Sequence, residues 1–359
     1  MSIQITKSAN DIGKSMTKMT PKKVNPRDLP SLNAASFDER VADHLRRFLA
    51  DKDAFAKNTW DQMLSVLRSW ARWCDERGKV WLPADYDDVR DYLFYLKEEL
   101  GRATSTVAQH KTMINKIHAE AGLLRPDDVR SVDRGMRKIR RTSVLKGEMI
   151  GQAIPLHREE LLKVAAAWES NTRLYQRRNL AFIGISYITL LRIAEISRLR
   201  VRDVTFSPDG TAILLVKHTK TIIDGYGVIK KLAPIVTEWL VNWLEMSGLA
   251  DQPDAFVFCG VDRYNKLRQT KNPLTHRAIE KIFSDAWSAL YGTQDGKSTK
   301  RYRTWTGHSP RVGAAQDMAK SGASLPQIMH EGTWKTPKQV MGYIRHLEAD
   351  NSIMLRMFR

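Results

Sequence analysis

Apolar residues spaced three and four apart recur through residues 36–142, and this pattern constrains the fold of the 359-residue chain more than any other feature. It predicts amphipathic helices, because a helix that buries one face repeats its apolar side chains about every 3.6 residues. The segment NTWDQMLSVLRSWARWC, which begins at Asn58, shows the spacing over its whole length. No strand pattern interrupts the helices, so we predict a helical bundle domain over residues 36–142.

Changes in this pattern divide the remaining chain. Residues 1–35 combine prolines with polar and basic residues, and their apolar residues show no period, so we expect a disordered tail. Residues 143–155 contain two glycines and little periodicity, which predicts a linker. A second domain over residues 156–348 and an apolar tail over residues 349–359 follow.

The second domain combines helices with a small sheet. Helical spacing recurs over stretches at about 157–169, 174–191, 234–247, 273–291, 310–322, 325–331 and 337–348. Apolar runs at 213–216 and 228–232 flank the turn pair Asp224-Gly225, which predicts a β-hairpin. The predicted fold class is therefore mainly α in two domains, the second with a small antiparallel β-sheet.

The charge balance favours a polyanionic partner. The chain has 58 Lys and Arg against 40 Asp and Glu, a net charge of +18. Nucleic acid suits such a charge, because each neutralised phosphate releases counterions; a generally basic soluble protein is the alternative. No apolar stretch approaches the ~18 residues of a membrane span, and no secretory signal is evident. The two cysteines, Cys74 and Cys259, form no metal-type cluster, so we expect a cytoplasmic protein with reduced thiols.

The segment WTGHSPRVGAAQDMA predicts an anion site at the start of a helix. Ser309 can cap this helix, and Pro310 fits its first position. His308 and Arg311 would then meet at the N-terminus, where backbone N–H groups favour an anion. The small residues 313–315 permit close approach of another element. By itself, however, His-x-x-Arg arises often by chance.

Two further segments carry polar side chains whose ordinary roles are structural. In TLLRIAEISRLRV, Arg192 and Glu195 are three residues apart and share a helix face, as many surface ion pairs do. In GTWKTPKQVMGYIRHL, Trp334 precedes a helix and Tyr343 lies about two turns into it. Both aromatic residues are ordinarily core residues, with the Tyr343 hydroxyl at the rim.

Together these residue types suit phosphoryl transfer to a tyrosine. The reaction places extra negative charge on the non-bridging oxygens, and arginine is well shaped to hold that charge where no metal does so. A phenol can serve as covalent nucleophile, and the phosphotyrosyl bond keeps the energy of the broken linkage. Rejoining the strand then needs no ATP.

The chain resembles the tyrosine recombinase, or phage integrase, family in an ordered set of residues: Arg192, Lys220, His308, Arg311, Trp334 and Tyr343. The segments LLRIAEISRLRV, TKT, GHSPRVGAAQDMA, DVRDYLFYL and GMRKIRR are similar to the Cre-type branch, and the resemblance covers about residues 37–348. Pro310 stands where the branch has a small residue, but it suits a helix start, so we expect no loss of function.

The resemblance implies how the reaction proceeds. Tyr343 attacks the scissile phosphate and leaves a 3′-phosphotyrosine and a free 5′-hydroxyl, while Arg192 and Arg311 hold the non-bridging oxygens. Lys220, on the hairpin, protonates the leaving 5′-oxygen. Lys217 is an alternative if the hairpin register differs, and a purely solvent-exposed lysine is another.

The remaining residues of the set have supporting roles by the same resemblance. His308 aids proton transfer and contacts the phosphate, and Trp334 donates its indole N–H to a phosphate oxygen. Glu195 orients the histidine and an arginine. No cofactor and no metal is implied.

The family also implies the partners. A helical, SAM-like core-binding domain and the catalytic domain clamp duplex DNA that has inverted-repeat arms and a short spacer, with helices in the major groove. The candidate contacts, each otherwise an ordinary exposed polar residue, are Gln62, Ser105, Gln109, Lys111, Arg137, Lys138, Arg140, Arg141, Arg277 and Glu280. Four protomers would assemble on two sites, with residues 349–359 docking on a neighbour or, alternatively, packing on their own domain.

The predicted function is therefore site-specific DNA recombination through a Holliday junction, in the cytoplasm on the nucleoid. A type IB topoisomerase would use the same chemistry to relax supercoils, but the Cre-like helical domain and the apolar tail argue against it. A non-catalytic DNA-binding protein of the same fold is a further alternative, and the intact set of residues argues against that one.

Overall fold

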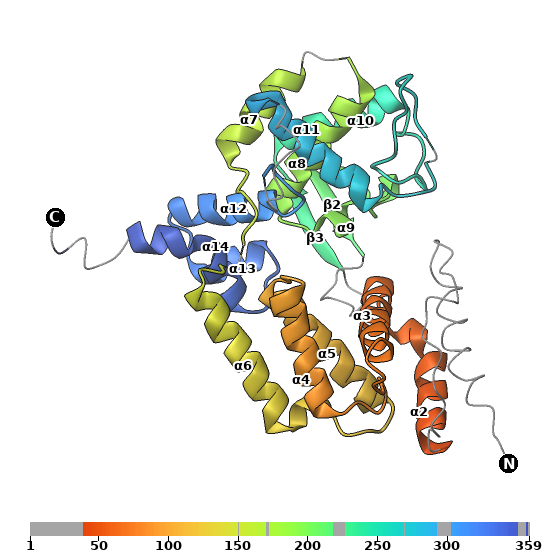
Figure 1. The fold of residues 1–359 in the computed structure, drawn as a ribbon. Helices are drawn as coiled ribbons and strands as arrows, with labels where there is room; N and C mark the ends of the chain where they lie inside the picture. Colours follow the sequence, from red (N-terminus) through yellow and green to blue (C-terminus); the bar gives the residue numbers. More distant parts are fainter. Residues whose placement is uncertain are drawn as a thin grey trace. The chain divides into compact units, whose positions relative to one another are not determined.

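The structure is a computed structural model that describes residues 39–149, 151–169, 172–217, 227–268, 270–292, 303–350 and 357. The chain divides into two compact units, with the boundary between residues 149 and 150 (Figure 1). Most described residues are helical and three strands form one antiparallel sheet, so the predicted fold class is confirmed. A helix with the length and hydropathy of a membrane span is not found among these residues.

The first unit is a helical bundle. Its helices are α2 (Glu39–Ala50), α3 (Lys57–Asp75), α4 (Tyr86–Phe94), α5 (Thr104–Glu120) and α6 (Arg130–Leu145), with shorter turns at Lys52–Ala54, Tyr95–Glu99 and Pro126–Asp128. Large aromatic residues fill its centre. Trp70 and Trp73 of α3 stack with their ring centroids 5.4 Å apart, and Tyr92 of α4 packs against both.

The stretch predicted as a linker begins as ordered structure of the first unit. Helix α6 continues to Leu145, three residues past the predicted end. The carboxylate of Glu148 then accepts hydrogen bonds from the backbone and hydroxyl of Thr104, both at 2.7 Å, and from Lys97 at 2.5 Å. Lys97 and Thr104 lower the pKa of Glu148 to about 2. A distant carboxylate thus supplies the cap at the start of α5.

The second unit contains the sheet and more helices. In chain order these are α7 (Arg158–Glu169), α8 (Leu174–Thr189), α9 (Ile193–Ile196), β1 (Val204–Phe206), β2 (Ala212–Val216), β3 (Val228–Leu232), α10 (Pro234–Ser247), α11 (His276–Tyr291), α12 (Ser309–Lys320), α13 (Leu325–Glu331) and α14 (Pro337–Asp350). The sheet order is β1-β2-β3. Strand β1 is absent from the sequence prediction, and the predicted Asp224-Gly225 turn lies outside the described residues.

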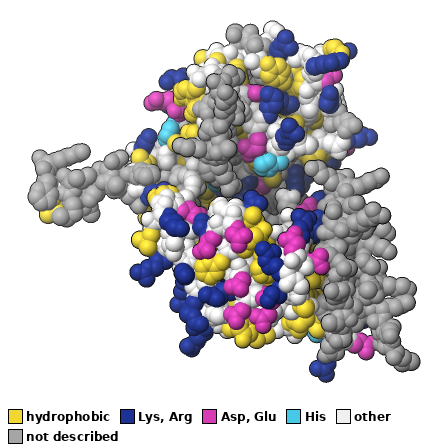
Figure 2. Space-filling model, in the orientation of Figure 1, with side chains coloured by type: hydrophobic (Ala, Val, Ile, Leu, Met, Phe, Trp, Pro, Cys, Tyr) yellow, Lys and Arg dark blue, Asp and Glu magenta, His cyan; other side chains and the backbone are white. Residues whose placement is uncertain are grey.

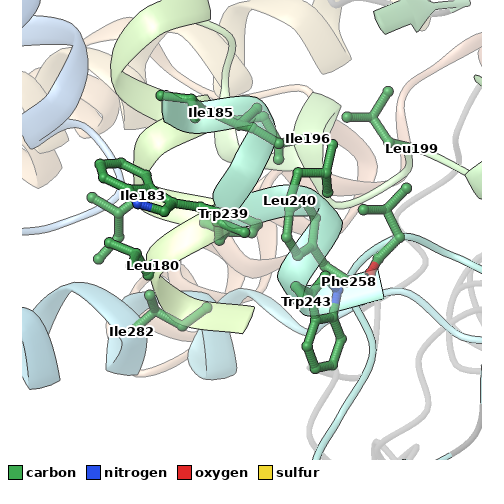
Figure 3. Close-up of a cluster of buried hydrophobic side chains, with 14 of the residues drawn as sticks. Leu180, Ile183, Ile185, Ile196, Leu199, Trp239, Leu240, Trp243, Phe258 and Ile282 are labelled. Atoms are coloured by element: carbon green, nitrogen blue, oxygen red, sulfur yellow. Dashed lines mark hydrogen bonds between the residues drawn. The ribbon is translucent and has the colours of Figure 1, made fainter. Parts of the chain in front are cut away.

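The core of the second unit is centred on α8 and α10, which pack side by side (Figure 3). Ile183 of α8 and the indoles of Trp239 and Trp243 of α10 are all buried. The indole N–H of Trp243 donates to the carbonyl of Val257 at 2.7 Å, so this polar atom is satisfied inside the core. This core supports α9 and the sheet, and a separate smaller cluster joins α12, α13 and α14.

Gly313 of α12 packs directly against the backbone of Leu156. A Cβ at Gly313 would lie 1.8 Å from the carbonyl oxygen of Leu156, as the small residues there predict. Gly313→Ala should therefore lower the free energy of unfolding by about 1–3 kcal/mol, the usual cost of overpacking. The control is Gly342→Ala, on a helix with no atom within 4 Å of a new Cβ, which should be neutral or stabilising. Equal urea midpoints for the two variants would contradict the prediction.

Candidate active site

Side chains from three helices and one turn converge in the second unit. Arg192 directly precedes α9, and His308 and Arg311 lie at the start of α12. Trp334 lies in the turn between α13 and α14, and Tyr343 lies on α14. Five residues from three separate segments of the sequence are thus brought together.

Tyr343 and His308 form a hydrogen-bonded pair. The phenol oxygen lies 2.7 Å from His308 Nε2, and the backbone carbonyl of Tyr343 accepts a hydrogen bond from the Gln316 side chain at 2.8 Å. Burial raises the pKa of Tyr343, while the charges of Arg311 and Arg192 act in the opposite direction. The phenol is therefore protonated at neutral pH, and a base would have to remove its proton before it could act as a nucleophile.

His308 is placed to accept that proton, because its Nε2 lies 2.7 Å from the phenol oxygen. Surrounding protein atoms, and then the positive charges of Arg311 and Arg192, lower the pKa of His308 to about 4, although part of the side chain is exposed. The imidazole is consequently neutral at pH 7 and has one nitrogen free of a proton. With Nε2 as the acceptor, the Tyr343 hydroxyl donates to it.

Arg311 is the most deeply buried charge of the site. Only 2% of it is exposed, its Nη2 donates to the carbonyl of Gly332 at 3.1 Å, and the guanidinium lies 4.8 Å from the centre of the Trp334 ring. Burial lowers the pKa of Arg311 to about 10, so it stays charged at neutral pH. Its Nε and Nη1 have no hydrogen-bond partner among the described residues. Because these donors lie beside the Tyr343–His308 pair, they are placed to bind an anion there.

Arg192 is placed by a sharp turn rather than by a helix face. Helix α8 ends at Thr189, earlier than predicted, because Leu190 adopts the left-handed conformation with φ 52°. Arg192 then caps α9, and Glu195 accepts from its backbone N–H at 2.9 Å and from its guanidinium at 3.1 Å. Glu195 is 5% exposed, so the carboxylate fixes Arg192 from inside the protein.

The start of α12 differs in one detail from the prediction. His308, not Ser309, occupies the N-cap position, and Ser309 is the first helical residue. The Ser309 hydroxyl accepts from the backbone N–H of Thr306 at 2.9 Å and so shapes the loop that carries His308. The imidazole and Arg311 still meet at the helix N-terminus, as predicted.

Lys220 lies outside the described residues. The alternative, Lys217 at the end of β2, is described, and its Nζ lies 2.6 Å from Asp203 Oδ1. Among the described residues, no three His, Cys, Asp or Glu side chains are grouped as in a metal site. Both cysteines are buried free thiols.

The sequence over residues 156–350 matches the Phage integrase family. The chain belongs to this family. It is 40% identical over 331 residues to Recombinase cre of Escherichia phage P1, which covers 92% of this chain and 96% of that protein. It is 25% identical to the Integrase/recombinase xerD homolog of Selenomonas ruminantium, covering 88% of this chain and 91% of that one.

Solved structures agree on the fold. The XerH site-specific recombinase, bound to a palindromic difH substrate in a post-cleavage complex, aligns with a TM-score of 0.62 at 14% identity, covering 99% of this chain and 98% of XerH. A lambda integrase dimer bound to a COC′ core site aligns with a TM-score of 0.52 at 15% identity, covering 86% and 95%. The predicted membership of the tyrosine recombinase family, a family of DNA recombination enzymes, is confirmed.

Two candidate DNA contacts of this integrase-family chain lie on α11. Arg277 is exposed near its start, and Glu280 is partly buried. The Glu280 carboxylate accepts from the backbone N–H of Gly307 at 3.3 Å, next to His308. The helix that is predicted to read bases is therefore hydrogen-bonded to the loop that carries the imidazole, a contact that no pattern in the sequence predicts.

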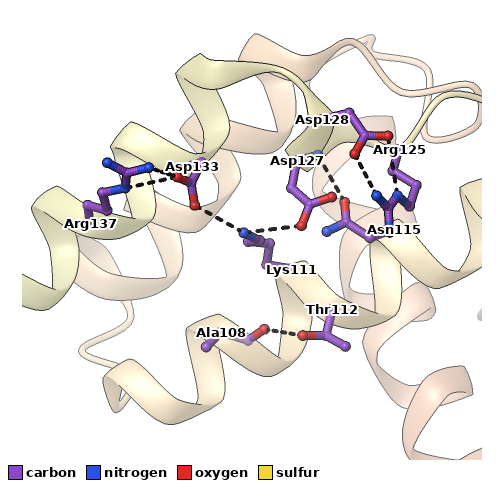
Figure 4. A network of polar contacts seen from close by, with 9 residues as sticks. All are labelled: Ala108, Lys111, Thr112, Asn115, Arg125, Asp127, Asp128, Asp133 and Arg137. Atoms are coloured by element: carbon purple, nitrogen blue, oxygen red, sulfur yellow. Dashed lines mark hydrogen bonds and ion pairs between the residues drawn. The ribbon is translucent and has the colours of Figure 1, made fainter.

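In the first unit, two of the candidate cations are paired with carboxylates. Lys111 lies 3.3 Å from Asp127 and 3.7 Å from Asp133, and Arg137 binds the same Asp133 at 2.6 Å (Figure 4). These carboxylates neutralise part of the positive charge of Lys111 and Arg137, so less of it is available to attract a DNA phosphate.

The other candidates in the first unit are accessible and polar. Gln109 is partly buried, and the exposed ones are Gln62, Ser105, Lys138, Arg140 and Arg141. On the surface shown in Figure 2, Lys and Arg side chains are interspersed with Asp and Glu. The charges on this face therefore do not by themselves mark out a candidate DNA-binding surface.

Proposed function

We propose that this chain is a site-specific recombinase that cuts and rejoins duplex DNA through a 3′-phosphotyrosine at Tyr343 and a Holliday junction, without metal or ATP. The observation that carries the proposal is Arg311, a buried guanidinium beside the Tyr343–His308 pair, two of whose donors have no partner in the part of the chain that the structure describes. Such a group can donate hydrogen bonds to a phosphate, and without one its buried donors lower the stability of the fold.

We propose the following cleavage step, which the geometry of the site supports. The Tyr343 hydroxyl gives its proton to His308, and the phenol oxygen bonds to phosphorus as the P–O5′ bond breaks. Arg311 and Arg192 hold the non-bridging oxygens, where negative charge develops. The departing 5′-oxygen takes a proton, for which Lys220 is the proposed donor. Rejoining is the same step in reverse, with a 5′-hydroxyl as nucleophile.

The proposed substrate is a duplex with inverted-repeat arms and a short spacer. Support comes from XerH, solved on a palindromic substrate, and from lambda integrase, solved as a dimer on a core site. We propose that a homotetramer acts on two such sites on the nucleoid in the cytoplasm, and that residues 349–359 dock on a neighbouring protomer. The likeness to Recombinase cre over 96% of its length favours recombination over relaxation by a type IB topoisomerase.

A nicked substrate tests the proposal. The site is sought as an inverted repeat next to the gene, and a nick placed just 3′ of the cleavage position lets the freed 5′-hydroxyl fragment diffuse away. The cut strand should then migrate with the protein on a denaturing gel when labelled at its 5′ end, and not when labelled at its 3′ end. Mass spectrometry should find the nucleotide on Tyr343. Attachment through a 5′-phosphate, or through another residue, would contradict the mechanism.

A further inference from the structure

Lys230 is a buried lysine that the mechanism above does not use. It lies on β3, opposite Leu214 of β2, and only 9% of it is exposed. A buried ammonium is unfavourable unless it is paired and hydrogen-bonded. Burial lowers the pKa of Lys230, and the Glu331 carboxylate acts against this effect.

The partner of Lys230 is the turn at residues 331–334, which we call the Trp334 turn. The ammonium donates a short hydrogen bond to the backbone carbonyl of Glu331, and Nζ lies 3.7 Å from Glu331 Oε2. The next carbonyl along the chain, that of Gly332, accepts from Arg311. Adjacent peptide groups therefore hold Lys230 and Arg311.

The Trp334 turn has little conformational freedom. A Cβ at Gly332 would lie 2.0 Å from the Trp334 ring, so the indole folds back directly over that residue. Thr333 adopts the left-handed conformation, with φ 51°. A non-glycine residue keeps this conformation only where its surroundings fix it, and such positions concentrate at functional sites. The Lys230 ammonium, a charged donor from β3, is bound two residues before Thr333, at Glu331.

We propose that Lys230 is a positioning residue of the active site, whose ammonium holds the Trp334 turn and thereby places the Arg311 guanidinium and the Trp334 indole around the scissile phosphate. The inference rests on the proposed function, because it requires Arg311 to bind that phosphate. Strand β3 would then have a role in the active site. Its Lys230 holds the carbonyl of Glu331, and the adjacent carbonyl of Gly332 orients Arg311.

The test compares full-length variants in single-turnover cleavage of the nicked site. Lys230→Met keeps the aliphatic stem and should bind the DNA normally while cleaving about 10²-fold more slowly, as small misplacements of catalytic groups do. Lys230→Arg keeps a charged donor and should stay within about tenfold of the parent. The matched control is Lys231→Met, on the exposed face of the same strand and 3.4 Å from Asp209, which should cleave like the parent.

A second substrate separates positioning from proton transfer. Sulfur in place of the bridging 5′-oxygen gives a leaving group that needs no proton, so it should restore cleavage to Lys220→Ala and leave Lys230→Met slow. In an Arg311→Lys background, Lys230→Met should slow cleavage little further, because Lys230 acts through Arg311.

Three results would overturn the role of Lys230: parental cleavage by Lys230→Met, recovery of that variant on the sulfur substrate, or full additivity with Arg311→Lys. If Lys230→Met does not fold, Lys230→Gln, whose shorter amide carries no charge, takes its place with the same expectations. Failure of the proposed function itself looks different, because the parent chain would then form no covalent product.

Discussion

A Tyr343→Phe variant is expected to bind its DNA site as tightly as the parent and to form no covalent protein–DNA complex, a loss of at least about 10⁴-fold in cleavage. The phenyl ring keeps the packing against Trp334 and His308, whose ring centroids each lie 5.7 Å from that of Tyr343. Only the oxygen and its hydrogen bond to His308 disappear, so the fold should change little. Denaturing electrophoresis of the nicked site measures the covalent product, and gel shift measures binding.

Tyr291→Phe supplies the matched control, because this substitution also removes a tyrosine hydroxyl. Tyr291 lies on α11 and is 54% exposed. It should cleave at the parental rate. A covalent band from Tyr343→Phe as strong as that of the parent would show that another nucleophile is used, and the mechanism derived from the Tyr343–His308 pair would have to be abandoned.

Helix positions follow from the sequence wherever an apolar stripe is long. Helix α3 matches its predicted apolar face, because its buried residues recur at three and four over 19 residues. The predictions that were wrong concern single short elements and helix ends. Strand β1 has three residues, too few for an alternating pattern to appear. Helix α8 ends early because Leu190 adopts a left-handed conformation, which a leucine side chain does not predict.

The candidate site shows the same division. Residue types and family resemblance predict Arg192, His308, Arg311 and Tyr343 as site residues. Spacing along the chain cannot show that residues 192 and 343 meet, since that depends on packing between α9, α12 and α14. Lys230 was missed for a related reason. In VIKKL the two lysines must face opposite sides of the strand, and only the packed structure shows which one is buried.

An Arg311→Met variant is expected to lose cleavage while keeping or gaining stability. Methionine fills a similar volume without charge, so cleavage should fall by about 10³-fold when the phosphate loses this donor. The same change removes a 2%-exposed guanidinium whose Nε and Nη1 lack partners among the described residues. Buried unsatisfied donors cost about 1–3 kcal/mol, and apolar replacements of buried charges are often neutral or stabilising.

The two opposite effects distinguish a phosphate clamp from a structural arginine. Single-turnover cleavage and the urea midpoint are measured on the same preparations, with Arg263→Met as control, since Arg263 is an exposed residue whose guanidinium lies over the Tyr264 ring. That control should change neither quantity. If Arg311→Met instead unfolds several kcal/mol more easily and still cleaves, the guanidinium serves the fold through its bond to Gly332. A functional site that buries a charge and leaves some of its donors without a partner among the described residues lowers stability in favour of chemistry, so removing that charge should restore stability.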